Sequence, residues 1–124
     1  MVEVNGVPLT VGVAGSAEQW PQGLSGVEVL EPLDGMLFVF PTVAERTFWM
    51  QGMLFPLDVA FFDADGFLVN VVAMDTCLDG DCPSYPSDGL AQYALETPQG
   101  SLGELPADTR LVIIGDLDGI GKEI

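Results

Sequence analysis

Two carboxylates and one amide lie within segments of the chain that are otherwise apolar. Asp58 and Asn70 belong to the stretches 57–62 and 67–74, and Glu96 ends a third such stretch. A carboxyl pair in a partly apolar cleft can perform acid–base hydrolysis, because one group keeps its proton while the other is ionised. Alternatively, Asp58 and Glu96 accept hydrogen bonds from turn amides and only stabilise the fold, which is the interpretation we favour. Asp58 and Glu96 are nevertheless the catalytic candidates of this sequence.

A few aromatic residues with polar groups accompany these side chains. A sugar or another neutral polar ligand is bound by flat aromatic rings beside hydrogen-bonding groups. Trp49 lies between Phe48 and Met50, and we favour the interpretation that it belongs to the core. The candidate ligand-binding residues are Trp49, Asp58, Asn70, Tyr85 and Glu96.

The two cysteines, Cys77 and Cys82, enclose the turn-forming sequence Asp79-Gly80. A turn at this point can bring the sulfur atoms within bridging distance, so we predict a disulfide in oxidising conditions. In a reducing cytosol the same pair would be two thiols. The spacing is not that of a Cys-x-x-Cys redox motif, and too few other ligands are near for a zinc site.

Histidine is absent from the sequence. This excludes Ser-His-Asp and Cys-His catalysis and removes the commonest ligand of zinc, copper and non-haem iron. The segments 63–66 and 116–119 begin like calcium loops but lack the closing glutamate. We therefore expect no metal site and no cofactor, and the alternative is a loose calcium site in the acidic loop around Asp79, Asp81 and Asp88.

The chain has 19 acidic and three basic residues, which gives a net charge of -16. Nucleic acids and anionic membranes are unfavourable partners, because their phosphates would be repelled. No apolar run is long enough to span a bilayer, and residues 1–10 lack the pattern of a signal peptide. We expect a soluble, cytoplasmic, monomeric protein that binds neither nucleic acid nor membranes.

The composition and the patterns of apolar residues predict how these side chains are positioned. Apolar residues make up 48% of the chain, which is enough for one domain over residues 1–124, with a frayed tail at 116–124. Asn5-Gly6 predicts a hairpin, and Ser16 begins the pattern of a short helix from Ala17 towards Gly23. We expect further strands at 36–40, 47–50 and 92–96, and a last, central strand at 110–114. We also expect a polar loop at 75–89 and a turn or short helix at 98–105.

The sequence Asp63-Ala64-Asp65-Gly66 predicts a three-residue hairpin loop with Asp63 opposite Phe67. Counting from this turn puts Asp58 and Asn70 on the same face of the hairpin. Both faces are apolar, so we expect the hairpin to be covered on both sides. The predicted fold is mainly β (α+β): a curved antiparallel or mixed sheet or an incomplete β-barrel, with one or two short helices.

Several motifs occur together in the order and spacing of a known protein family. They are Gln22–Leu24, Asp34–Phe40, Phe48–Met50, Phe55–Asp63, Cys82–Tyr85 and Tyr93–Glu96 with Gly100. With these motifs the chain resembles the domain of unknown function 192 family of bacteria and archaea over roughly Val2 to Asp118. The resemblance implies a β-rich, barrel-like fold with short helices and implies no activity. Ser25 and Gln51-Gly52 depart from the residues usual in the family.

Three hypotheses for the function follow. The first is a small module that binds a neutral polar ligand, such as a carbohydrate, between an aromatic ring and Asp58, Asn70 or Glu96. The second is a hydrolase that uses Asp58 and Glu96. The third is a structural or interaction domain. Carboxylates facing one another across a cleft would favour the enzyme, and carboxylates bound to backbone amides would favour a structural role.

Overall fold

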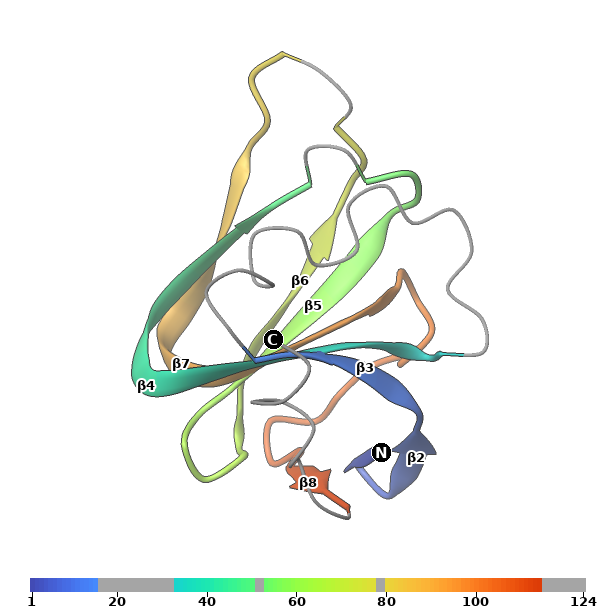
Figure 1. Cartoon of the computed structure of the whole chain (residues 1–124), viewed down its shortest axis with the longest axis vertical. Helices are drawn as coiled ribbons and strands as arrows, with labels where there is room; N and C mark the ends of the chain where they lie inside the picture. Colours follow the sequence, from blue (N-terminus) through green and yellow to red (C-terminus); the bar gives the residue numbers. More distant parts are fainter. Residues whose placement is uncertain (16–32, 51–52, 78–79, 115–124) are drawn as a thin grey trace.

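The computed structural model describes residues 1–15, 33–50, 53–77 and 80–114. These residues form strands in two sheets, of order β2-β1-β8 and β3-β4-β7-β5-β6 (Figure 1). The strands are β1 (Val2–Val4), β2 (Val7–Leu9), β3 (Val11–Ala14), β4 (Gly35–Trp49), β5 (Leu57–Phe62), β6 (Leu68–Met74), β7 (Ser84–Pro98) and β8 (Leu111–Ile113). The fold is therefore mainly β, as predicted, and its sheets are open rather than closed into a barrel.

The small sheet joins the two ends of the described chain. Asn5 and Gly6 have φ angles of 53° and 81°, as required for the tight turn between β1 and β2. The predicted hairpin is thus confirmed, although its second arm is divided between β2 and β3, which lie in different sheets. β8 pairs with β1 at the edge of the small sheet, so the segment expected to be a central strand is an edge strand. Its other side meets the turn before β6, where the Leu111 N–H donates to the Gly66 carbonyl at 2.7 Å.

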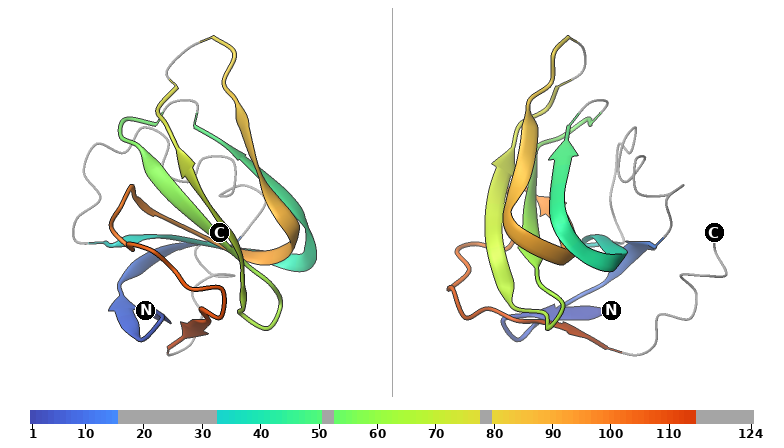
Figure 2. Two further views of the ribbon diagram at one scale, coloured as in Figure 1. Left: turned by 180° about the vertical axis from the view of Figure 1, so that it is seen from behind. Right: turned by 90° about the vertical axis from the view of Figure 1, so that its left-hand side faces the viewer.

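The larger sheet is dominated by two long strands, β4 and β7. Figure 2 shows that both bend strongly along their length, so the sheet curls over one of its own faces. The bends coincide with register irregularities between Val39 and Ala44 and between Glu45 and Thr47. Extra residues of this kind bend a strand and increase its twist. β7 also takes up residues 84–89, which were expected to belong to a polar loop.

The residues of the larger sheet alternate between two apolar clusters. On one face Leu37, Ala60, Phe62 and Leu95 pack with Val2, Val4 and Leu111 of the small sheet. We call the opposite, curled face the inner face. It carries Phe38, Val59, Phe61 and Ala94, and Phe48 contacts Phe38 and Phe61 edge-on at centroid distances of 5.0 and 5.6 Å.

The turn between β5 and β6 forms as predicted. Asp63 donates its backbone N–H to the Phe67 carbonyl at 2.9 Å and accepts the Phe67 N–H on its carboxylate at 2.9 Å. Gly66 has a φ of +88°, and a Cβ there would lie 2.6 Å from the Leu111 carbonyl oxygen. Glycine is therefore required at this position both by the backbone conformation and by the close approach of β8.

The register beyond this turn differs from the prediction. Phe62 pairs with Leu68 but Phe61 pairs with Asn70, so Val69 is an extra residue in β6. The bulge moves Asn70 to the inner face with Phe61, whereas Asp58 pairs with Ala73 on the other face. β6 also has exposed residues, Val71 and Ala73, so the hairpin is not covered on both sides.

The short helices are the other difference. β7 ends at Pro98, and residues 99–102 form turns, so the expected turn or short helix at 98–105 is a turn. The described residues contain no helix. The helix expected from Ala17 towards Gly23 and the tail at 116–124 lie outside the described residues.

Candidate functional site

Glu96 is a buried carboxyl group in the middle of the larger sheet. Its side chain is only 3% exposed. It lies on β7 between two apolar neighbours, Met36 on β4 and Val59 on β5. Residues paired across a sheet share a face, so Glu96 projects from the inner face, where Val59 and Met36 pack in the apolar cluster.

The surroundings of Glu96 strongly disfavour its ionised form. Burial raises the pKa of Glu96 to about 8, because the apolar surroundings remove the carboxylate from solvent. At neutral pH the group is a neutral carboxylic acid that can both donate and accept a hydrogen bond. A buried carboxyl that forms no hydrogen bond within the described residues is costly to the fold and is a candidate for function.

Asp58 is not at the same site. It pairs with Thr97, whereas Glu96 pairs with the next residue, Val59, so the two carboxyl groups project from opposite faces of the sheet. The Asp58 carboxylate accepts a hydrogen bond from the Gly100 N–H at 2.9 Å. The structure therefore does not bring together the pair that the hydrolase hypothesis requires, and Asp58 instead stabilises the turn after β7.

Asp58→Ala tests this structural role. The change removes the acceptor for the Gly100 N–H, which water can partly replace because the group is exposed. We expect the free energy of unfolding to fall by about 1 kcal/mol. Chemical denaturation at neutral pH measures the loss, and Asp58→Asn, which keeps an acceptor oxygen, serves as the control. Equal stability of the alanine variant and the unmodified protein would contradict the role.

Asn70 and Tyr85 lie on the same side of the sheet as Glu96 but have structural partners. Asn70 accepts the Asp88 N–H on its amide oxygen at 3.0 Å. The Tyr85 ring packs against the inner-face cluster, and its hydroxyl accepts the Asp75 N–H at 3.4 Å, which is long for a hydrogen bond.

Trp49 is not part of the core, contrary to the interpretation favoured from the sequence. It is 57% exposed, and it pairs with Ser84 at the end of β4. Its neighbour Phe48 packs on the inner-face cluster, and alternation along the strand directs Trp49 to the opposite, outer face. An aromatic ring at Trp49 and the carboxyl of Glu96 therefore cannot line one groove.

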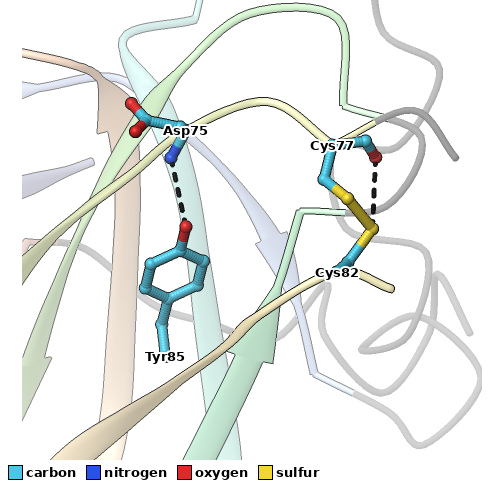
Figure 3. Close-up of a disulfide and its surroundings, with 4 residues drawn as sticks. All are labelled: Asp75, Cys77, Cys82 and Tyr85. Atoms are coloured by element: carbon cyan, nitrogen blue, oxygen red, sulfur yellow. Dashed lines mark hydrogen bonds between the residues drawn. A yellow bond between two sulfur atoms is a disulfide. The ribbon is translucent and has the colours of Figure 1, made fainter. Parts of the chain in front are cut away.

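Cys77 and Cys82 form a disulfide with a Cα–Cα distance of 5.8 Å (Figure 3). This separation lies in the range typical of disulfides. The Cys82 sulfur also lies 3.5 Å from the Cys77 carbonyl oxygen. Cys77 and Tyr85 both pack against the inner-face cluster, so the disulfide lies at the margin of the face that carries Glu96.

The sequence did not indicate what the two arginines of the described residues do. The Arg46 guanidinium lies 4.1 Å from the centre of the Phe40 ring and donates to the carbonyl oxygens of Ala91 and Thr42. Arg110 lies 5.3 Å from the Phe67 ring and donates to the Asp65 carbonyl at 3.2 Å. Both cations thus stabilise strand and turn geometry.

The described part of the chain lacks both a metal-binding cluster and a membrane-spanning helix. It contains no cluster of three or more Cys, Asp or Glu side chains that could hold a metal ion. It also contains no helix long and apolar enough to cross a membrane.

Fold and site together define a small β-sheet protein with a buried neutral carboxyl on the curled face of its larger sheet. The chain belongs to the DUF192 family, described as "Uncharacterized ACR", whose family model matches residues 1–111. The family assignment made from the motifs is thus confirmed. A search of curated proteins found no match.

The solved structures that are similar to this one include the following two. A crystal structure from Sinorhizobium meliloti 1021, described as a "putative transcription regulator", is 27% identical with a TM-score of 0.75 and covers 89% of each chain. A protein of unknown function from Novosphingobium aromaticivorans DSM 12444 is 22% identical with a TM-score of 0.72. That match covers 83% of this chain and 74% of the other, and it supports the fold alone.

Proposed function

We propose that this protein is a small binding module for a neutral polar ligand, with the Glu96 carboxyl as its polar anchor. The supporting observation is the burial of Glu96, at 3% exposure, between Met36 and Val59 with no hydrogen bond to another described residue. A protonated carboxyl can donate one hydrogen bond and accept others, which suits a hydroxyl-bearing ligand such as a carbohydrate.

The charge of the molecule supports a neutral ligand. The net charge is -16, so an anionic ligand would be repelled over the whole surface. Arg46 and Arg110 are already engaged with aromatic rings and carbonyl oxygens. A cationic ligand would have to ionise Glu96, and the burial that raises its pKa opposes this.

The other hypotheses receive less support. A hydrolase based on Asp58 and Glu96 would require both carboxyl groups at one cleft, and they project from opposite faces of the sheet. The description of the Sinorhizobium protein as a transcription regulator concerns that protein. With three basic residues against 19 acidic ones, direct binding of this chain to a DNA backbone is unfavourable.

A thermal-shift screen with neutral monosaccharides, oligosaccharides and polyols tests the proposal. A specific ligand raises the melting temperature by mass action, by an amount equivalent to about 2.7 kcal/mol at one hundred times its dissociation constant. We expect at least one neutral compound to produce a concentration-dependent shift. We also expect Glu96→Leu, which removes the hydrogen-bonding group, to abolish it.

Trp49→Ala is the matched control, because Trp49 lies on the outer face and is 57% exposed. This variant is expected to retain the shift. Loss of binding in Trp49→Ala with retention in Glu96→Leu would place the ligand on the outer face and contradict the proposal. A screen without any hit would also contradict the proposal, and so would a screen whose hits are all charged compounds.

A further inference from the structure

The larger sheet curls until its edge strand β6 lies beside the first half of β7, and we call this junction the β6–β7 seam (Figure 2). No backbone ladder joins the two strands within the described residues, because β6 pairs only with β5 and residues 84–91 pair with β4. Residues 75–83 join the end of β6 to the start of β7. Among the described residues, three side-chain connections hold the seam and this connecting segment together: Asn70 with Asp88, Tyr85 with Asp75, and Cys77 with Cys82.

These connections differ in strength. The hydrogen bond between Asn70 and Asp88 measures 3.0 Å, and the one between Tyr85 and Asp75 measures 3.4 Å. Exposed hydrogen bonds of this kind contribute little to stability, because water competes for both the donor and the acceptor. The disulfide is the one covalent connection among the three, so it is the one whose cleavage would most change the seam.

The disulfide also lies in a largely exposed part of the chain. Both cysteines are only partly buried, and their neighbours Asp75, Asp81 and Pro83 are exposed. Reduction of a disulfide requires that a thiolate approach one of the sulfur atoms, so access governs which disulfides react. Figure 3 shows the bridge at the outer end of the seam, beyond the Asp75–Tyr85 hydrogen bond.

We propose that the Cys77–Cys82 disulfide is a thiol–disulfide exchange site whose cleavage opens the β6–β7 seam, and that its redox partner is a neutral or cationic thiol. The proposal does not depend on the ligand proposed for Glu96. It concerns the same face of the molecule, since Cys77 and Tyr85 pack against the inner-face cluster.

The exchange takes place in two steps. A thiolate of the reductant attacks one cysteine sulfur, forms a mixed disulfide and releases the other cysteine as a thiolate. A second reductant thiol then attacks the mixed disulfide, which releases the remaining cysteine and leaves the reductant as its own disulfide. Two electrons and two protons pass from the reductant to Cys77 and Cys82. Oxidation reverses these steps.

The acidic residues around the bridge determine the class of reductant. Asp75 and Asp81 are exposed and each lies within two residues of a cysteine, and the chain carries a net charge of -16. An anionic thiolate that approaches this segment is repelled, and salt weakens the repulsion. A reductant with a cationic group lacks this barrier, so charge selects the thiol that reacts.

The first experiment measures opening by hydrogen exchange on the whole protein, oxidised and then reduced with dithiothreitol. We expect reduction to accelerate exchange of the Asp88 and Asp75 amides at least tenfold, because both donate across the seam. The Ala60 amide, in the interior of the ladders that β5 forms with β6 and β7, is expected to be unchanged. Reoxidation should restore the slow exchange. The variant Cys77→Ser/Cys82→Ser should resemble the reduced protein.

The second experiment compares reduction by cysteamine, which is cationic, with reduction by glutathione, which is anionic. Rates are normalised to those of each reagent with hydroxyethyl disulfide. At low ionic strength we expect glutathione to be about fivefold slower or more, and added salt to remove most of the difference. The double variant Asp75→Asn/Asp81→Asn should reduce the difference between the normalised rates of the two reagents. The control variant Asp108→Asn, which changes an exposed acid in the loop before β8, should leave this difference unchanged.

Three results would overturn the proposal. They are unchanged exchange at Asp88 and Asp75 after reduction, free thiols in protein purified without reductant, and equal normalised rates for the two reagents. None of them bears on ligand binding at Glu96, which Glu96→Leu tests separately.

Discussion

Glu96→Gln is expected to remove a large part of the pH dependence of stability. The folded state keeps the Glu96 proton up to about pH 8, whereas the unfolded chain releases it near pH 4.5. Between these values the folded state binds one more proton, so the free energy of unfolding falls by about 1.4 kcal/mol per pH unit as the pH rises. Below about pH 4.5 and above about pH 8, Glu96 adds nothing to the pH dependence of the free energy of unfolding. Glutamine resembles the protonated carboxyl and does not titrate.

The measurement is urea denaturation of both proteins from pH 4 to pH 9. The two proteins should be equally stable near pH 4. As the pH rises towards 8, the glutamine variant should become increasingly more stable than the unmodified protein. The difference between the two curves cancels the contribution of the other acidic residues. Glu104→Gln, at an exposed carboxyl, should follow the unmodified protein. Parallel curves for Glu96→Gln and the unmodified protein would show that Glu96 titrates normally in the fold.

Gly35→Ala is expected to be strongly destabilising, by about 3 kcal/mol or more. An added Cβ would lie 2.4 Å from the Glu96 carbonyl oxygen and 3.0 Å from Thr97 Cγ2. The nearer atom belongs to the backbone of β7 and cannot rotate away. β4 and β7 would therefore have to separate at the row that contains Glu96, and the midpoint of denaturation should fall accordingly.

Gly89→Ala provides the control within the same pair of strands. The nearest atom to a Cβ at this position is Val69 Cγ1 at 3.6 Å, an ordinary van der Waals contact. We expect this variant to retain most of its stability. If Gly35→Ala and Gly89→Ala denatured at the same midpoint, the close approach of β4 to β7 at Gly35 would not exist in solution.

Local signals in the sequence predicted the turns well and the register poorly. The loop from Asp63 to Gly66 and the Asn5-Gly6 turn formed as expected, because their geometry depends on a few adjacent residues. The bulge at Val69 depends on how β6 fits against β5 and the curled part of β7, and no residue type marks it in the sequence. One extra residue was enough to move Asn70 to the face opposite Asp58.

The same distinction applies to the candidate site. Glu96 was selected because it is polar within an apolar segment, and its place in the sheet makes it buried. Its separation from Asp58 follows from the pairing of β5 with β7, two strands far apart in the sequence. Trp49 was misjudged because its neighbours Phe48 and Met50 are apolar. In a strand, however, adjacent residues face opposite sides of the sheet. When Phe48 and Met50 are buried on one side, Trp49 between them must face the other.

The pairing of β1 with β8 has a consequence for the biosynthesis of this protein. Val2 pairs with Ile113 and Val4 with Leu111, and the Ile114 N–H donates to the Met1 carbonyl at 2.9 Å. A ribosome releases the first of these strands long before the second, and such distant pairings form slowly. The buried side chains Val2 and Val4 therefore lack their β8 partner until translation has passed residue 113. The N-terminal hairpin, with its tight Asn5-Gly6 turn, gives β1 a local partner during this interval.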